Sequence, residues 1–319
     1  ANRNGKHAVS EVPLVLTVEE AWALVESYEK TGKWSTLGVE QVLLETGDGA
    51  NLAVLNMVRQ GVLGDMIHAE SGYVHDLRKV KFPDGTEPWR LDHSIKRNGN
   101  LYPDHPMNRI MPIIDINRGD RFDFLMSMSS KPGVLNEYAA ATLGKDHPLA
   151  KTKYAQGDYN ASILHTVDGK LVTLNFDTNT PHPREYYRVQ GTKGVYMDSR
   201  GLGGPWIYLD GVSPEEHKWE PAKPYLEEYR HPLLKNYSPP PRKSLRGHGG
   251  SDTKTPITWH LLIKALREGK EPYFDVYDSV TSSVITALTE QSVANRSRPV
   301  EFPDFTRGKW KARKPLEVG

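Results

Sequence analysis

The segment from Lys96 to His105 concentrates groups that can do chemistry. It places a tyrosine, a histidine, two asparagines and two cations within ten residues. The segment follows neither the helical nor the strand period, and a glycine and a proline interrupt it, so it predicts a loop. Titratable side chains on a loop are more typical of a site than of a connector, although a solvated turn is the alternative.

Two further candidates lie upstream of this segment. Tyr73 and His75 end a strand predicted over residues 66–76, and strand alternation places both side chains on one face. A phenol and an imidazole on one face can act as acid and base. Arg90 can bind a carboxylate or a sugar hydroxyl through its planar fork. The alternatives are an aromatic residue on an edge strand, a surface histidine and a surface ion pair.

Polar residues also end the first two predicted strands. Glu11 and Val12 precede Pro13 at the end of one strand, and Glu40-Gln41 end the next. Ligands of open α/β sheets bind at the carboxyl ends of strands, so two such ends in register indicate a binding edge. Considered separately, each strand end has a simpler explanation, since a polar residue often lies where a strand passes into a loop.

The elements around these residues predict an α/β fold. Thr17 and Glu20 form a capping box at the start of a helix over residues 17–31. Strands at residues 7–13 and 34–39 and a helix over residues 50–63 complete a strand–helix–strand–helix unit, which is typical of a parallel sheet. The opening residues resemble the end of a helix capped by Gly5, so we expect an upstream part of this sheet to be missing from the chain.

The remaining chain predicts a larger open mixed sheet with helices. The hairpin around Asp168-Gly169 is the strongest turn signal. Residues 77–120 and 199–254 predict irregular structure. We therefore divide the chain into residues 1–64, the end of a Rossmann-type domain, and residues 65–319, a substrate-binding domain with C-terminal helices. The other expected elements are strands at 121–128, 161–167, 170–177, 186–190 and 194–198 and helices at 256–268 and 276–294.

Composition narrows the function classes. The 41 basic and 40 acidic residues nearly cancel, which removes the electrostatic case for a nucleic-acid or membrane-surface partner. Without cysteines the chain has no thiolate chemistry, and no spacing of histidines and acids matches a known metal site. The glycine pattern that binds dinucleotide phosphates, G-x-G-x-x-G, does not occur in these residues. A homo-oligomer is compatible with the sequence, and the cellular compartment stays undetermined.

Taken together, the motifs resemble those of glycoside hydrolase family 109, within the Gfo/Idh/MocA oxidoreductase-like superfamily. The resemblance extends over nearly the whole chain and is therefore specific. It rests on residues 5–13, 55–59, 72–78, 96–105, 116–121, 191–194, 248–250, 292–295 and 302–308.

The resemblance implies an NAD-dependent α-N-acetylgalactosaminidase-like enzyme. In this family the sugar is oxidised at C3, loses its C1 substituent by elimination, gains water and is reduced again. The implied cofactor contacts are Glu11, Val12, Gln41 and Tyr102. The implied proton-transfer residues are Tyr73, His75, Tyr102 and His105. The implied sugar contacts are Glu40, Arg90, Tyr102, Pro103, Asp104, His105 and Tyr186. Family members are often exported, and their signal would lie upstream of this chain.

Several departures from the family pattern leave alternatives open. Asp104 stands where the family usually has threonine, and Pro106 where it has glycine, so we expect a neutral, hydroxyl-rich sugar and a weaker preference for N-acetylgalactosamine. The first rival is a sugar dehydrogenase of the same superfamily, which typically carries a proton-transfer lysine at the position of Val12. The second rival is an inactive carbohydrate-binding fragment.

Overall fold

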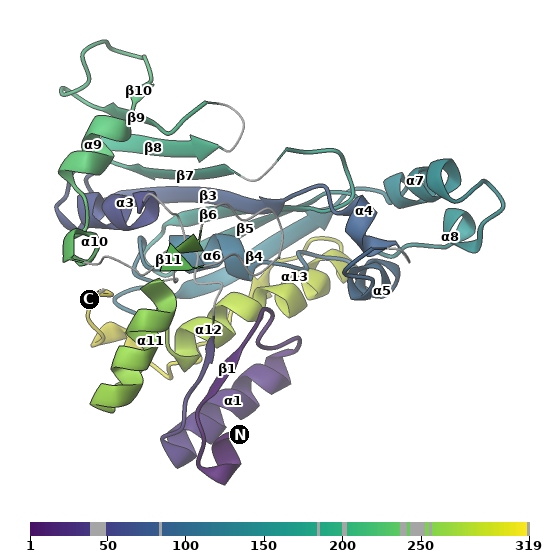
Figure 1. The fold of residues 1–319 in the computed structure, drawn as a ribbon, viewed down its shortest axis with the longest axis horizontal. Coiled ribbons are helices and arrows are strands. Elements are labelled where there is room, and N and C mark those ends of the chain that lie inside the picture. Colours follow the sequence, from purple (N-terminus) through teal and green to yellow (C-terminus); the bar gives the residue numbers. More distant parts are fainter. Residues whose placement is uncertain are drawn as a thin grey trace.

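The computed structural model describes residues 1–38, 49–82, 85–183, 186–199, 203–236, 241–242, 253–254 and 257–317. Its first unit is a parallel pair of strands joined by a helix (Figure 1). β1 (Ala8–Ser10) pairs with β2 (Ser35–Leu37), and α1 (Val18–Thr31) connects them. The capping box at Thr17 is confirmed, because the Thr17 hydroxyl accepts a hydrogen bond from the backbone N–H of Glu20 at 3.1 Å.

The chain opens on a short 3-10 helix, Asn2–Asn4, which Gly5 ends in the left-handed conformation at φ 71°. The expected capped helix end is therefore confirmed. The predicted helix over residues 50–63 is α3 (Ala50–Arg59), which ends four residues early. In Figure 1, α3 lies beside the larger sheet rather than on the β1–β2 pair.

The second and larger layer is a mixed sheet. Its described strands have the order β10-β9-β8-β7-β3-β6-β5-β4-β13. Only β3 and β6 run parallel, and the other neighbours are antiparallel, which confirms the expected open mixed sheet. The strands are β3 (Met66–Val74), β4 (Phe122–Ser129), β5 (Asn160–Thr166), β6 (Leu171–Asp177), β7 (Tyr186–Gly191), β8 (Gly194–Ser199), β9 (Trp206–Leu209), β10 (Glu220–Pro221) and β13 (Val300–Glu301). A separate pair joins β11 (Pro241–Arg242) and β12 (Thr253–Lys254).

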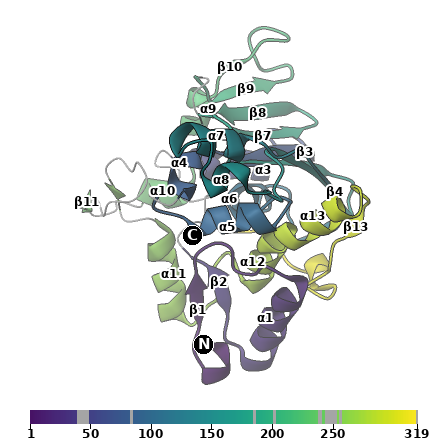
Figure 2. The ribbon, with the colours of Figure 1, turned by 90° about the vertical axis from the view of Figure 1, so that its right-hand side faces the viewer.

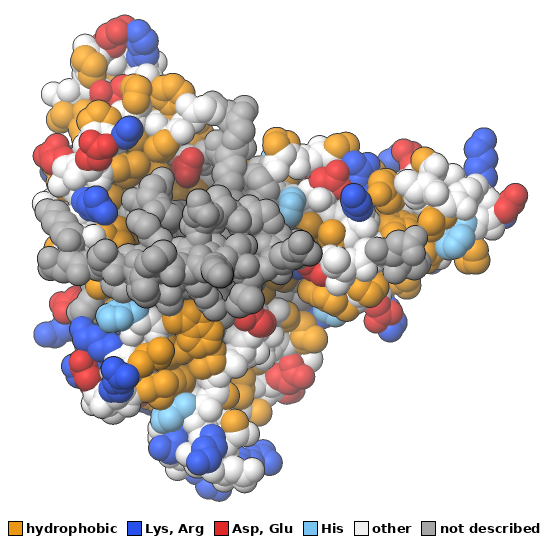
Figure 3. Space-filling model, in the orientation of Figure 1, with side chains coloured by type: hydrophobic (Ala, Val, Ile, Leu, Met, Phe, Trp, Pro, Cys, Tyr) orange, Lys and Arg blue, Asp and Glu red, His pale blue; other side chains and the backbone are white. Residues whose placement is uncertain are grey.

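Helices cover one face of this sheet and form the core with it (Figures 1 and 2). α6 (Asp104–Ile110), α12 (Val276–Ser283) and α13 (Ile285–Ala294) pack there, with Leu125, Val172 and Val280 among the buried side chains. The single helix expected over residues 276–294 is thus two helices that meet at Val284. α11 (Ile257–Glu268) lies outside this layer, and its exposed side chains include Ile263 and Leu266. Hydrophobic side chains gather over this part of the molecule in Figure 3.

The regions expected to be irregular contain short helices and strands. α4 (Arg78–Lys81), α5 (Trp89–Lys96) and α6 lie within residues 77–120. Isolated helices this short are unstable, so packing rather than local sequence determines them. The expected loop from Lys96 to His105 is wrong at both ends, since Lys96 ends α5 and Asp104 begins α6. The other elements missed are α7 (Val134–Thr142), α8 (Pro148–Lys151), α9 (Lys223–Glu228), α10 (Pro232–Asn236), β9 to β13 and the 3-10 helix Lys309–Lys311.

Among the described helices, none combines the length and the hydrophobicity that crossing a bilayer requires.

Candidate active site

Three aromatic rings meet above the sheet where β3 ends. The ring of Tyr73 lies 4.4 Å from that of Tyr102 and 5.2 Å from that of His105, and the last two rings are 4.9 Å apart. His75 is at the edge of the group, with its ring 6.1 Å from that of Tyr73. The structure therefore brings together all four residues predicted to transfer protons, and we call them the aromatic cluster.

Each member of the aromatic cluster is placed by a different element. Tyr73 points toward the helix-covered face because it lies two residues after Ser71 on β3, and the Ser71 hydroxyl accepts a hydrogen bond from Arg109 of α6 at 3.0 Å. Tyr102 belongs to the loop between α5 and α6, and its backbone N–H donates to Asn100 Oδ1 at 3.3 Å. His105 lies in the first turn of α6, which begins after Pro103 as the N-cap residue. Pro103 therefore shapes the turn that presents both rings.

Arg90 covers the aromatic cluster from α5. Its guanidinium lies 4.7 Å from the centre of the Tyr102 ring and forms an ion pair with Glu87. Burial alone would lower the pKa of Arg90, but the neighbouring tyrosines and Glu87 outweigh burial and raise it. Arg90 is therefore a fixed cation beside two phenols, where it can stabilise negative charge on either phenol oxygen.

Sequence reasoning missed a second cation behind Arg90. Lys81 ends α4, and its side chain is 1% exposed. Its ammonium donates to Thr178 Oγ1 at 2.8 Å, to Ser94 Oγ at 3.3 Å and to Asn179 Oδ1. Burial, with the charge of Arg90 as second cause, lowers the pKa of Lys81 to about 7. A lysine in a short basic run looks like a surface residue, so no sequence signal distinguished it.

The loop after β1 reaches the aromatic cluster. Val12 packs against the cluster, and the backbone N–H of Leu14 donates to Ser283 Oγ of α12 at 3.1 Å. The same Ser283 hydroxyl donates to Asp104 Oδ1 at 2.7 Å. One serine thus links the predicted cofactor side with the helix that carries His105. Glu11 is exposed at the end of β1. Glu40 and Gln41 lie outside the described residues.

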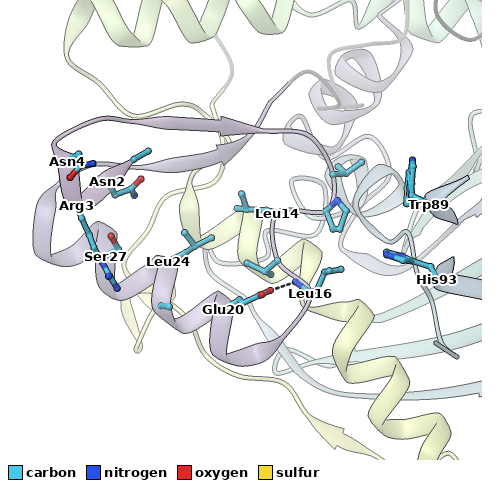
Figure 4. A pocket seen from close by; sticks show the side chains of 15 residues that line it. Asn2, Arg3, Asn4, Leu14, Leu16, Glu20, Leu24, Ser27, Trp89 and His93 are labelled. Atoms are coloured by element: carbon cyan, nitrogen blue, oxygen red, sulfur yellow. Dashed lines mark hydrogen bonds between the residues drawn. The ribbon is translucent and has the colours of Figure 1, made fainter. Parts of the chain in front are cut away.

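A large cavity adjoins this loop (Figure 4). Its volume is about 880 Å³, and it extends along α1 toward Trp89 and His93 of α5. Leu14 and Leu16 line it, and the backbone N–H of Leu16 donates to Glu20 at 2.8 Å. Cofactor sites have volumes in this range. Val12 lines the cavity and also packs against a hydrophobic cluster that includes Tyr73 and Tyr102, so the two regions are adjacent.

One predicted sugar contact, Tyr186, lies away from the aromatic cluster. Tyr186 is on the opposite face of the sheet from Tyr73, because the β3–β7 register pairs Ser71 with Tyr187 and strand neighbours alternate. The Tyr186 hydroxyl donates to Glu70 Oε1 at 2.9 Å on that opposite face. The structure therefore does not bring Tyr186 together with the aromatic cluster.

Asp104 also has structural partners. It is fully buried, and its Oδ1 accepts hydrogen bonds from Ser282 at 2.5 Å and from Ser283. These contacts with α12 favour a role in docking α6 over contact with a sugar. Pro106 lies in the first turn of α6, where a helix has no acceptor for a backbone N–H, so this proline removes no helical hydrogen bond.

Comparison with known proteins decides the family. Residues 49–312 match the model of the glycosyl hydrolase 109 C-terminal domain. The chain belongs to glycosyl hydrolase family 109. A family 109 protein from Solibacter usitatus is 39% identical over 99% of this chain and 69% of its own length. A protein from Shewanella oneidensis named alpha-N-acetylgalactosaminidase is 39% identical over 99% of this chain and 67% of its own length.

Solved structures agree with the fold. An oxidoreductase domain protein from Kribbella flavida superimposes with a TM-score of 0.68 at 21% identity, over 95% of this chain and 76% of that chain. Levoglucosan dehydrogenase in complex with NADH and L-sorbose superimposes with a TM-score of 0.65 at 18% identity, over 95% of this chain and 75% of that chain. These likenesses confirm the Gfo/Idh/MocA-type fold expected from the family 109 motifs.

Proposed function

We propose that this family 109 protein hydrolyses glycosides by a redox-neutral route that uses NAD, with an α-linked 2-acetamido-galactoside as its first candidate substrate. The observation that carries the proposal is the aromatic cluster, in which Tyr73, Tyr102 and His105 stack beside the cation of Arg90. The name of the Shewanella oneidensis relative supports the substrate class.

The aromatic cluster supplies the proton groups that this route needs. A base must remove the proton from C2 of the oxidised sugar, and an acid must protonate the oxygen that leaves C1. Tyr73 and His105 have rings 5.2 Å apart, so a phenol and an imidazole are available at one place. Water then restores both positions, with its oxygen at C1 and a proton at C2. Arg90 stabilises a phenolate or an enolate formed beside it.

The chain's residues fit a nicotinamide cofactor at the loop after β1. Bound NAD would supply the acceptor and donor of the hydride at C3. Val12 joins the large cavity to the aromatic cluster and presents a small apolar surface there. Val12 has no proton to transfer, so the acid–base work falls to the cluster. That division favours hydrolysis over the dehydrogenase alternative, in which a lysine at this position moves the proton.

The buried position of Asp104 changes which sugar we expect as substrate. Since this carboxylate is fully buried against α12, it provides no argument for a shift away from the 2-acetamido sugar. A panel of nitrophenyl α- and β-glycosides, with and without the 2-acetamido group, tests the substrate class. Release of NAD on denaturing the purified protein tests the cofactor. Net formation of NADH with an oxidised sugar would instead establish a dehydrogenase.

The catalytic role of the aromatic cluster is tested by comparing two tyrosines. We expect Tyr73→Phe to lower turnover by roughly 10²–10⁴, the usual range for a positioned acid or base. Tyr186→Phe is the matched control, because it removes the same hydroxyl from the opposite face of the sheet. Unchanged turnover in Tyr73→Phe, or equal losses in both variants, would contradict the assignment.

A further inference from the structure

A small cavity lies beside Arg90 and Tyr102. Its volume is about 20 Å³, and its polar lining includes Lys81, Ser94 and Gln156. A cavity needs roughly 10–15 Å³ to hold one water, so this one has room for a single molecule. Tyr102 and Arg90 belong to the same lining, which brings the cavity into contact with the candidate active site.

Gln156 indicates what this cavity holds. Its side chain is 2% exposed, and neither its Nε2 nor its Oε1 has a hydrogen-bond partner among the described residues. Its backbone N–H donates to the Ser94 carbonyl at 3.0 Å, which fixes the residue against α5. Leaving one buried polar group unsatisfied costs about 1–3 kcal/mol, and here two are unsatisfied. A water with one donor and one acceptor toward Gln156 removes both costs.

Lys81 is surrounded by partners that suit both of its protonation states. The Ser94 hydroxyl donates to the Arg90 carbonyl at 3.0 Å, so toward Lys81 it acts as an acceptor. The Thr178 hydroxyl can accept from an ammonium or, after rotation, donate to a neutral amine. No described carboxylate forms an ion pair with Lys81. The charged or titratable groups facing it are Arg90 and His93 of α5, Tyr102 before α6, Asp177 at the end of β6, Asp158 before β5 and Asp76 before α4.

We propose that Gln156 and Lys81 hold one buried water behind the Arg90–Tyr102 pair, and that Lys81 is a positioning residue whose charge acts on this pair across that water. When Lys81 is protonated, its charge adds to that of Arg90 and stabilises a phenolate in the aromatic cluster. When Lys81 is neutral, that stabilisation is lost. The second half of this proposal rests on the proposed function, and the water site does not.

The water site is tested without any activity. A high-resolution crystal structure of the protein should show one water within hydrogen-bond distance of Gln156 and Lys81, and Gln156→Leu should lack it. In ¹⁵N-lysine NMR, one Nζ signal should titrate near neutrality, and Lys81→Met should remove that signal. A dry cavity in the crystal, or lysines that all titrate near their ordinary range, would overturn the proposal whether or not the protein is a glycosidase.

The positioning role is tested by the pH profile of turnover. We expect the wild-type kcat to change about tenfold between pH 6 and pH 9 around an inflection near 7, the size of effect that a nearby buried charge can produce. Lys81→Met should lose this inflection, and Lys81→Arg, which stays charged, should keep the low-pH behaviour throughout. Gln156→Leu should move the inflection while leaving Lys81 in place.

If the pH profiles of the wild type, Lys81→Met and Lys81→Arg differ only by a constant factor, Lys81 has a structural role alone. That result would overturn this half of the proposal. Thermal unfolding of each variant identifies loss of fold, and Gln156→Leu keeps the test valid if either Lys81 variant is unfolded. A protein with no glycosidase activity but with the NMR and crystallographic results would contradict the proposed function and leave the water site established.

Discussion

Opposite kinds of partner surround Arg118 and Lys81, two of the little-exposed cations in the described part of this molecule. Arg118, whose side chain is 10% exposed, contacts Asp278 at 2.7 Å and Asp275 at 3.3 Å. Arg313 forms a second ion pair with Asp275, so two positive and two negative charges balance. Lys81 has only hydroxyl and amide oxygens as hydrogen-bond acceptors among the described residues.

The difference appears in how each cation responds to burial. Burial would lower the pKa of Arg118, but its two carboxylates raise it above the ordinary value, so this cation never titrates. Burial, with the charge of Arg90 as second cause, lowers the pKa of Lys81 to about 7, and the opposing influence of Asp177, Asp158 and Asp76 is smaller because none of them forms an ion pair with it. A charge-balanced cluster therefore fixes α12 to the C-terminal tail, whereas a neutral cage leaves a group that can change its charge.

Breaking the balanced cluster should have the largest effect. We expect Arg118→Met to lower the free energy of unfolding by about 3–5 kcal/mol, because it leaves two buried carboxylates with one cation. Urea unfolding measures the change. Lys96→Met is the control, since Lys96 is 66% exposed and its pair with Asp92 should contribute about 0.5 kcal/mol at most. Similar losses in the two variants would show that burial of the cluster does not matter.

Because its hydrogen-bond partners are neutral, Lys81 should make the stability of the protein depend on pH. Between pH 7 and the ordinary lysine pKa of 10.5, the unfolded chain binds a proton at Lys81 that the folded protein does not. The stability of the wild type should therefore rise with pH across this window, by at most about 1.4 kcal/mol per pH unit from this group. Below pH 7 both states are protonated, and the full cost of burying the ammonium is present.

Lys81→Met isolates this contribution. The unfolding free energy of this variant should compare most favourably with that of the wild type at pH 6. As the pH rises from 7 to 10, the unfolding free energy of the wild type should increase steadily relative to that of the variant. Chemical unfolding at each pH gives the two curves. Parallel curves across this range would mean that Lys81 keeps an ordinary pKa in the folded protein.

A third variant tests a buried anion with neutral partners. Ser283→Ala removes one of the two serines on Asp104 and leaves the Leu14 N–H without its acceptor. We expect a loss of about 1–3 kcal/mol in unfolding free energy, the cost of unsatisfied buried groups. Thr142→Ala is the control, because its hydroxyl bonds only the preceding turn of α7 on the surface. Equal losses of unfolding free energy in the two variants would show that Ser283 does not link the loop after β1 to α6.

Local signals in the sequence predicted much of this fold. The capping box at Thr17, the glycine end at Gly5 and the hairpin at Asp168-Gly169 each depend on a few neighbouring residues, and all three are present. Strands β3 to β8 of the large sheet were likewise predicted, whereas the short strands β9, β10 and β13 were not. In contrast, α4, α5 and α6 are too short to show a period, and packing against other elements stabilises them, with α6 against β3 and α5 against α4 and α7.

The candidate site was predicted in part for the same reason. Tyr73 and His75 share a strand end, and Tyr102 and His105 share a turn, so their types and spacing were informative. The separation of Tyr186 from the aromatic cluster could not be predicted, because the face that a strand residue occupies depends on register with a distant strand. Lys81 was missed because burial of a lysine is a property of the assembled fold, to which α4, α5 and the end of β6 all contribute.

The central claim is that Tyr73 and its neighbours remove and return a proton at C2 of the sugar. The most direct test is hydrolysis in deuterated water, followed by NMR or mass analysis of the released sugar. A redox-neutral route through the aromatic cluster predicts deuterium at C2 of the product, and Tyr73→Phe should slow its incorporation together with turnover. Efficient hydrolysis with no deuterium at C2 would contradict the account, because bond cleavage would then proceed without proton abstraction beside the oxidised carbon.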